Sequence, residues 1–110
     1  MEITRSIVEG KVGLTVVGEL DASTAIEMDN MLKALLEEEK YEVVINLSDL
    51  SYISSAGVGV FISFIDDFTD KGGNLALHSL QDNVLEVFSM LGLDGILTIV
   101  GNEAEAVAAF

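Results

Sequence analysis

The sequence predicts a single α/β domain built on a mostly parallel five-stranded sheet, with an N-terminal antiparallel hairpin strand and four helices. Three observations lead to this fold class. The chain has 110 residues, which suits one domain spanning 1–110. Half of its residues are apolar, enough for a hydrophobic core. After two β-rich runs, helix-like and strand-like segments alternate, an order typical of a parallel sheet with covering helices.

The first third of the chain predicts a hairpin followed by a helix. Residues 3–8 and 12–17 are β-rich runs joined by a short turn that contains glycine. After a break at 18–21, apolar residues recur in steps of three and four, which is the period of a helix. Thr24 and Glu27 have the spacing of a capping box at the start of that helix.

The middle of the chain contains one ambiguous segment. Residues 43–47 form a short apolar run, consistent with a buried parallel strand. The apolar residues of 55–71 fit both helical and strand spacing. The length of this segment and the stop signal Gly72-Gly73 favour a helix.

The last third predicts two strands and two helices. Residues 75–77 form a short strand, followed by a helix that Ser79 caps and that ends at Gly92. Residues 96–100 form the last strand. Asn102 opens a short final helix.

The acidic composition argues against two classes of partner. The net charge is −14, and the few basic residues are scattered. Nucleic-acid binding draws most of its strength from clustered Lys and Arg, so we expect no nucleic-acid partner. An anionic membrane surface would be repelled in the same way. An acidic surface suits a partner protein with a basic face, although it is also what an ordinary solvated surface looks like.

The absence of cysteine excludes disulfides and thiolate metal sites and fits a reducing compartment. The N-terminal residues lack the basic and apolar regions of a signal peptide, and no apolar run approaches the length of a membrane span. We therefore expect a cytoplasmic protein with no membrane association.

Polar residues follow the predicted strands. In a parallel sheet the loops after the strands gather at one end, where ligands usually bind. Here those loops are residues 18–23, 48–55 and 79–81. They would bring together Glu19, Asp21, Asp49, Ser51, Ser54 and Ser55. Ser55 would lie at the start of a helix, where a hydroxyl can cap free N–H groups and where a phosphate would meet the positive helix end. From this pattern alone, Ser54 or Ser55 could be only a cap.

Signals for enzyme chemistry are weak. The segment Gly57-Val58-Gly59 lacks the third glycine of a dinucleotide loop. A serine nucleophile needs a base, and the only histidine, His78, lies at the end of a predicted strand, a place more typical of a packed or surface residue than of a catalyst. Loop carboxylates could hold Mg²⁺, but solvated acids and caps explain them equally well. We expect no catalytic residues, no metal and no cofactor, and hence no enzyme.

One motif narrows the function. Asp49–Gly59, with the sequence DLSYISSAGVG, resembles the signature of anti-sigma-factor antagonists, which belong to the STAS domain family. Gly18–Asp21, Lys71–Leu75 and Val87–Leu93 resemble other segments of that family in the same order. The resemblance covers nearly the whole chain.

The resemblance implies a regulatory cycle. In the family, an anti-sigma factor is also a serine kinase, and the unphosphorylated antagonist binds it and frees a sigma factor. Phosphorylation of the antagonist stops this binding, and a phosphatase resets the cycle. The acceptor position corresponds to Ser55. Ser54 stands where the family often has aspartate and is a rival acceptor, and Ala56 stands where the family often has Ser or Thr.

The same resemblance suggests a partner-binding surface around Ser55. We expect Val58 or Val60 to be partly exposed beside the acceptor, because the apolar residues of this helix cannot all lie on one stripe. The full predicted surface is Glu19, Asp21, Asp49, Ser54, Ala56, Gly57, Val58 and Val60. The alternatives are a STAS scaffold, a transporter-associated regulatory domain or, from a different class, a small nucleotide-binding protein.

Overall fold

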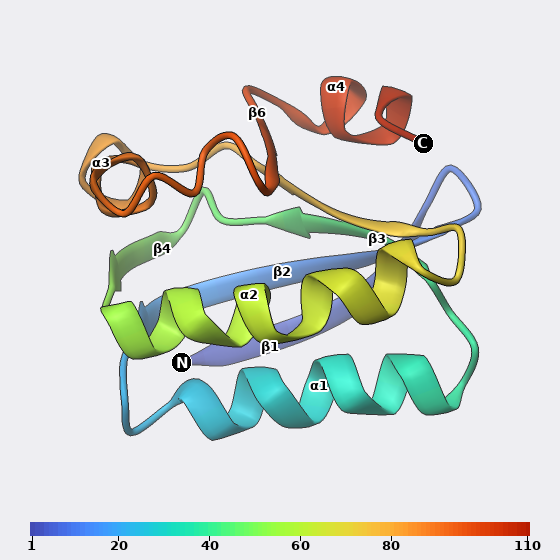
Figure 1. The fold of residues 1–110 in the computed structure, drawn as a ribbon, viewed down its shortest axis with the longest axis horizontal. Helices are drawn as coiled ribbons and strands as arrows, with labels where there is room; N and C mark the ends of the chain where they lie inside the picture. The colour runs from blue at the N-terminus through green and yellow to red at the C-terminus, as the bar shows by residue number, and fades with distance from the viewer.

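The computed structural model describes residues 1–110 and contains six strands and four helices (Figure 1). The strands are β1 (Glu2–Val8), β2 (Lys11–Leu20), β3 (Glu42–Asn46), β4 (Leu50–Ile53), β5 (Asn74–His78) and β6 (Thr98–Val100). The helices are α1 (Ala25–Glu37), α2 (Ser55–Thr69), α3 (Asp82–Met90) and α4 (Glu103–Ala108).

The predicted α/β fold class is confirmed. The main sheet has the order β1-β2-β3-β5-β6, in which only the β1–β2 hairpin is antiparallel. The turn of the hairpin is at Glu9 and Gly10, both with positive φ. The parallel arrangement places the carboxyl ends of β2, β3, β5 and β6 along one edge of the sheet.

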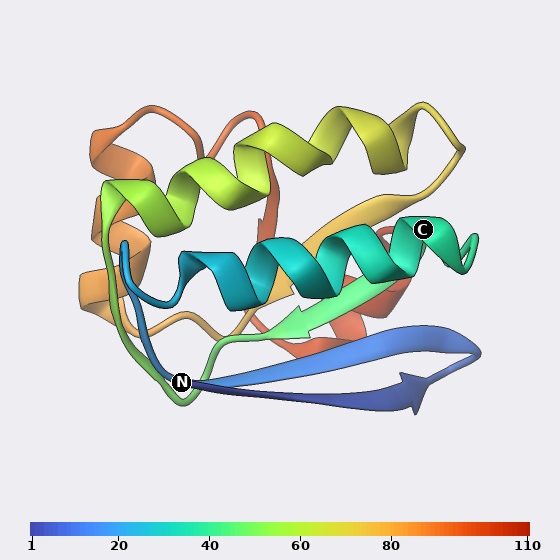
Figure 2. The same ribbon diagram turned by 90° about the horizontal axis from the view of Figure 1, so that it is seen from below.

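Helices cover both faces of the sheet. Helices α1 and α2 lie side by side over one face (Figure 2), and the large core lies beneath them. On the opposite face, α4 packs through Ala106 on Val44 and Ala76. Val43 and Ile45 face the large core, whereas Val44 faces α4, which explains why the β3 segment is apolar throughout instead of alternating.

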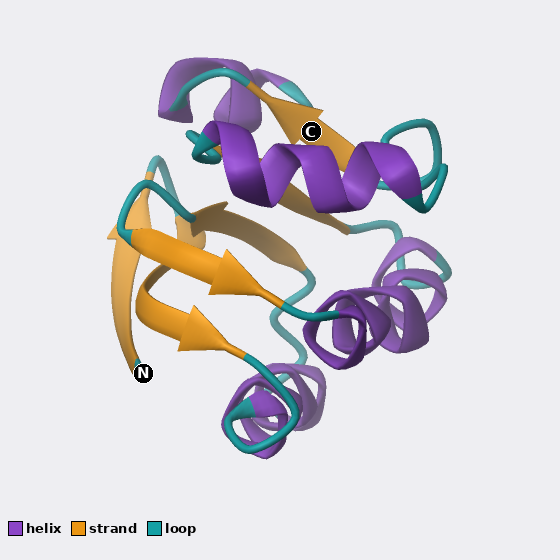
Figure 3. Ribbon diagram, turned by 90° about the vertical axis from the view of Figure 1, so that its left-hand side faces the viewer, coloured by secondary structure: helices purple, strands orange, loops and turns teal.

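The ambiguous segment after Ser54 is a helix, as predicted. Seven of its residues are buried, including Phe61 and Phe68. Helix α3 lies roughly across α1 and α2 at one end of the molecule (Figure 3). It is joined to α2 by packing of Phe88 on Phe61, whose ring centroids are 6.3 Å apart. No helix combines the length and the apolar character needed to cross a bilayer.

The structure adds a sixth strand that the sequence analysis assigned to a loop. Strand β4 lies off the main strand order and pairs in parallel with the end of β2, over Gly18–Leu20. Its end residues Leu50 and Ile53 are buried, whereas Ser51 and Tyr52 between them are exposed. This in-out-out-in pattern has neither the alternation nor the continuous apolar run by which strands are found in sequence.

Two predicted helix caps are wrong. Ser79 does not cap α3, because it adopts a left-handed conformation (φ 61°) and the helix begins after Gln81. Thr24 is the residue before α1, but its hydroxyl makes no cap hydrogen bond, so the capping box with Glu27 does not form. The cap predicted at Asn102 is confirmed, since Asn102 Oδ1 accepts a hydrogen bond from the N–H of Glu105 at 2.9 Å.

Candidate functional site

The carboxyl end of the sheet brings three predicted loops together. The N–H of Gly18 donates to the carbonyl of Asp49 at 3.0 Å, and the N–H of Ser54 donates to the carbonyl of Leu20 at 2.9 Å. The hydroxyl of Ser51 donates to the carbonyl of Gly18 at 3.0 Å. These bonds tie the segment that precedes α2 to the end of β2.

Ser54 and Ser55 have different environments. Ser54 is the N-cap of α2, and its Oγ accepts a hydrogen bond from the N–H of Gly57 at 3.3 Å. Ser55 is the first helical residue and is exposed, as is Ala56. Ser54 Oγ therefore serves as the acceptor of the helix cap, whereas Ser55 is exposed to solvent.

Gly57 allows α2 to approach the sheet closely. A Cβ at this position would lie 2.8 Å from both Leu20 Cγ and the Leu20 carbonyl oxygen, and 3.0 Å from a side-chain carbon of Ile53. A larger residue would push the first turn of α2 away from β2 and β4. Gly57 is buried, and its role at the site is to let the first turn of α2 pack closely on β2 and β4.

The expectation that Val58 or Val60 is partly exposed is wrong. Their side chains are 1% and 8% exposed and belong to the large core. Helix α2 packs against the sheet, α1 and α3, so apolar residues on more than one of its sides are buried. The exposed positions of the turn are the small residues Ser55, Ala56 and Gly59.

The three predicted acids, Glu19, Asp21 and Asp49, differ in exposure and in hydrogen bonding. Glu19 and Asp49 are exposed. Asp21 is half-buried and accepts hydrogen bonds from the hydroxyl of Ser23 at 2.6 Å and from the N–H groups of Ser23 and Thr24 at 2.9 and 3.2 Å. The bonds from Ser23 are the main reason that the pKa of Asp21 is lowered, so its carboxylate stabilises the turn that leads into α1.

Two residues at the start of α3 also contact this end of the sheet. Neither was a predicted site residue, although Gln81 lies in the predicted loop 79–81. Gln81 Nε2 donates to the carbonyl of Ser48 at 3.0 Å, and Asn83 Nδ2 donates to the carbonyl of Ser51 at 2.7 Å. The partners are 33 and 32 residues apart in the chain. No local pattern marks a bond from an amide side chain to a distant carbonyl, so sequence alone offered no signal.

Comparison with known proteins identifies the family. A family model described as the STAS domain matches residues 2–106. The chain belongs to the STAS domain family. An anti-sigma-B factor antagonist from Listeria monocytogenes is 31% identical over 94 residues, which is 86% of this chain and 82% of the relative.

Solved structures share this STAS fold. The crystal structure of the Thermotoga maritima protein TM1081 has a TM-score of 0.89 and 27% identity, covering 97% of this chain and 92% of that chain. The anti-sigma factor antagonist SpoIIAA in its unphosphorylated form has a TM-score of 0.79 and 22% identity, covering 98% of this chain and 95% of that chain. At 22% identity the likeness to SpoIIAA shows the fold alone.

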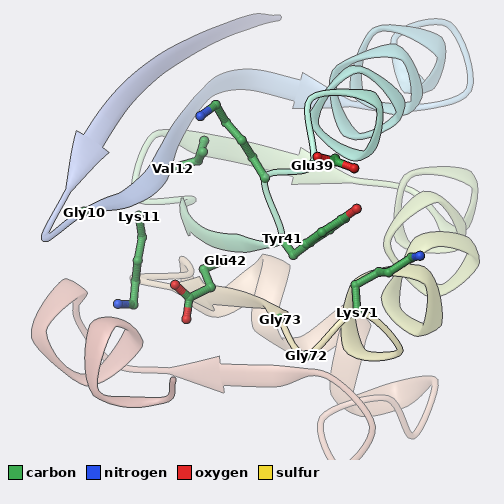
Figure 4. Close-up of a pocket in the computed structure, with 10 residues that line it drawn as sticks. Gly10, Lys11, Val12, Glu39, Tyr41, Glu42, Lys71, Gly72 and Gly73 are labelled. Carbon is green, nitrogen blue, oxygen red and sulfur yellow. The ribbon is translucent and has the colours of Figure 1, made fainter.

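The largest cavity of this STAS domain lies at the other end of the strands. It has a volume of about 410 Å³ and is lined by residues at the amino ends of β2 and β3 and before β5 (Figure 4). Lys11 and Lys71 point in opposite directions, away from each other (Figure 4). Glu39 and Glu42 also line the cavity. The lining mixes three lysines (Lys11, Lys40 and Lys71) with two glutamates, so it presents no single sign of charge to a ligand, and the Ser55 end remains the candidate site.

His78 is buried in this STAS domain and is 2% exposed. Its Nδ1 is 2.8 Å from the hydroxyl of Ser79, and its Nε2 has no hydrogen-bond partner. Burial lowers the pKa of His78, while the charge of Glu103 opposes this shift. The structure brings no group of three or more His, Asp or Glu side chains into positions that could hold a metal ion.

Proposed function

We propose that this STAS domain is an anti-sigma-factor antagonist that is switched by phosphorylation of Ser55. The observation that supports this most directly is the exposed hydroxyl of Ser55 on the first turn of α2. The names of several relatives, including those from Listeria monocytogenes and Bacillus subtilis, point to the same function. The chain supplies an acceptor hydroxyl, and the partner supplies the catalysis.

In the proposed cycle, the unphosphorylated domain binds an anti-sigma factor and thereby releases a sigma factor. The anti-sigma factor is also a serine kinase, which transfers the γ-phosphoryl group of ATP to the oxygen of Ser55. ADP is released, and the hydroxyl proton passes to a base of the kinase. A phosphatase removes the group again. The cycle takes place in the cytoplasm, where ATP is supplied.

The choice between the two serines rests on what each hydroxyl does. Ser54 is half-buried at the N-cap, and its Oγ accepts the hydrogen bond from Gly57 N–H, so a kinase would reach Ser54 less easily than the exposed Ser55. The hydroxyl of Ser55 lies one residue into the helix and is free to react. A phosphate there would meet the positive end of α2, so we expect the fold to tolerate it.

The effect on binding follows from charge. A phosphate adds about −1.5 to −2 charge and strong acceptor oxygens at one point of the surface. Ser55 is surrounded by the small residues Ala56 and Gly59, which allow a partner surface to approach closely. A surface matched to a neutral hydroxyl would then face a buried, unpaired charge. The exposed acids Glu19 and Asp49 form a rim that suits a basic partner face.

The test is phosphorylation by the purified anti-sigma kinase, with matched serine variants. Ser55→Ala is expected to abolish incorporation of phosphate, while Ser54→Ala continues to be modified. The phosphomimetic Ser55→Asp is expected to weaken calorimetric binding to the anti-sigma factor by at least about tenfold, at low and high salt alike. Asp49→Asn is expected to weaken binding chiefly at low salt, because exposed rim charges are screened.

Two results would contradict the proposal. Loss of incorporation in Ser54→Ala, with normal incorporation in Ser55→Ala, would make Ser54 the acceptor. Unchanged affinity of Ser55→Asp, with intact fold by circular dichroism, would place the interface elsewhere and favour a STAS scaffold that lacks this switch.

A further inference from the structure

Strand β4 leads the chain to Ser55 and has few contacts within the sheet. It lies off the main strand order and pairs only with Gly18–Leu20 of β2, with a shift of register within that short pairing. Its two central residues, Ser51 and Tyr52, are exposed. Because β4 ends immediately before the Ser54 cap, the position of β4 determines where the first turn of α2 begins.

Two amide side chains at the start of α3 hold β4 in place by hydrogen bonds to backbone carbonyls in and just before this strand. Asn83 Nδ2 donates to the carbonyl of Ser51 at 2.7 Å, the shorter of the two bonds. Gln81 Nε2 donates to the carbonyl of Ser48 at 3.0 Å. Ser51 is thus fixed from two sides, since its hydroxyl also donates to the carbonyl of Gly18 at 3.0 Å.

Helix α3 is itself firmly anchored. Val84 and Phe88 are fully buried, and Phe88 packs on Phe61 of α2. Helix α3 therefore contacts the helix that carries Ser55 and, through Asn83, also holds the strand that precedes it. Strand β4 is thus linked to α2 in two ways, directly through the chain and indirectly through α3, which bonds to β4 through Asn83 and packs on α2 through Phe88.

We infer that Asn83, supported by Gln81, is a positioning residue that fixes the first turn of α2, and with it the position of Ser55, for the partner. This inference rests on the proposed function of Ser55. Asn83 and Gln81 are exposed, so neither amide depends on its hydrogen bond to compensate for burial. Their substitution should leave the core intact and alter the geometry at the start of α2.

The decisive variant is Asn83→Asp. It keeps the size of the side chain, removes the N–H donor and places a carboxylate against the Ser51 carbonyl. An acid in the first turn of α3 is favourable for that helix, so the variant does not weaken α3 itself. Asn30→Asp, at an exposed position of α1, adds the same charge and serves as the matched control.

The first measurement is the steady-state rate of phosphorylation by the anti-sigma kinase. Asn83→Asp is expected to lower the rate at saturating substrate by roughly three- to tenfold, the range expected from one lost hydrogen bond. Asn83→Ala, which removes the donor without adding charge, must show a similar loss. Asn83→Gln, which retains a donor, is expected to recover part of the rate, and Asn30→Asp should match the wild type.

The second measurement needs no partner. Amide hydrogen exchange at Gly57 and Val58 reports on the first turn of α2, because both N–H groups bond to Ser54. Exchange at these amides is expected to be faster in Asn83→Asp than in Asn30→Asp, by more than any difference between the urea midpoints of the two variants accounts for. A merely structural role for Asn83 would instead lower the urea midpoint without a specific change at Gly57 and Val58.

The outcomes separate this inference from the proposed function. If Ser55 of the wild type is not phosphorylated, the proposed function fails, and the exchange data still decide whether Asn83 holds this turn in place. If Ser55 is phosphorylated, but Asn83→Asp matches Asn30→Asp in both rate and exchange, then the positioning role is wrong and the switch remains.

Discussion

At the scale of single residues, the candidate site contains two adjacent serines in different environments, Ser54 as the helix cap and Ser55 exposed. Sequence reasoning placed both near the start of a helix but could not assign the cap, because Ser is a good cap residue at either position and helix ends are uncertain by a residue or two. The structure assigns the cap to Ser54 through its bond to Gly57. Similarly, Val58 and Val60 are buried because α2 has neighbours on several sides, which no local sequence pattern reveals.

His78 gives a pH dependence whose sign follows from its burial. Its pKa is lowered in the folded state, chiefly by burial, from an ordinary value of 6.5. Well above pH 6.5, His78 is neutral in both the folded and the unfolded state, so it makes no pH-dependent contribution to the unfolding free energy. As the pH falls below 6.5 toward the lowered pKa, the unfolded state binds a proton that the folded state resists, so stability should decrease.

The measurement is urea unfolding of the wild type and of His78→Gln between pH 7.5 and 5. The difference in unfolding free energy between the two proteins should change over this range, since only the wild type has the buried imidazole. A difference that stays constant with pH would show that His78 titrates normally. Above the ordinary pKa of His, the difference is expected to be flat.

At the scale of elements, periodicity predicted α2 and missed β4. The α2 segment was resolvable because it is long and ends in a glycine stop signal, although its apolar residues fit two periods. Strand β4 has four residues with only Leu50 and Ile53 buried, too few to define a period. Its strand conformation is imposed by pairing with β2, which is a tertiary effect.

Two glycines of α2 should respond in opposite ways to the same substitution. Gly57→Ala would place a methyl 2.8 Å from the Leu20 carbonyl oxygen, which cannot move easily, and is expected to lower the unfolding free energy by roughly 1–3 kcal/mol. Gly59→Ala meets no atom within 4 Å and is expected to raise it by about 0.5–1 kcal/mol through helix propensity. Urea denaturation of both variants tests this, and effects of the same sign would contradict the packing described for Gly57.

At the scale of the whole molecule, acidic residues far outnumber basic ones. The net charge is −14, and the ion pairs are Arg5–Glu38 and Lys33–Asp29. None of the helices has a basic residue in its last turn, where a cation would be favourable. Self-repulsion should therefore oppose the compact state.

Salt is expected to stabilise the domain. Raising NaCl from 0.05 to 0.5 M shortens the screening length and should increase the unfolding free energy by roughly 1 kcal/mol in urea titrations. A variant with Glu37→Gln and Glu39→Gln, at the end of α1, should start with higher stability and gain less from salt. A decrease in stability with salt, or an equal gain in the variant, would argue against repulsion as the cause.

The placement of Ser55 and Lys71 near opposite ends of the sheet has a practical consequence. Lys71 is exposed in the turn before β5, beside the large cavity. Because the sequence has no cysteine, Lys71→Cys would supply a single thiol for attachment to a sensor surface or a fluorophore. Every molecule would then be immobilised in one orientation, with Ser55 facing the solution, and partner association could be recorded without the label obstructing it.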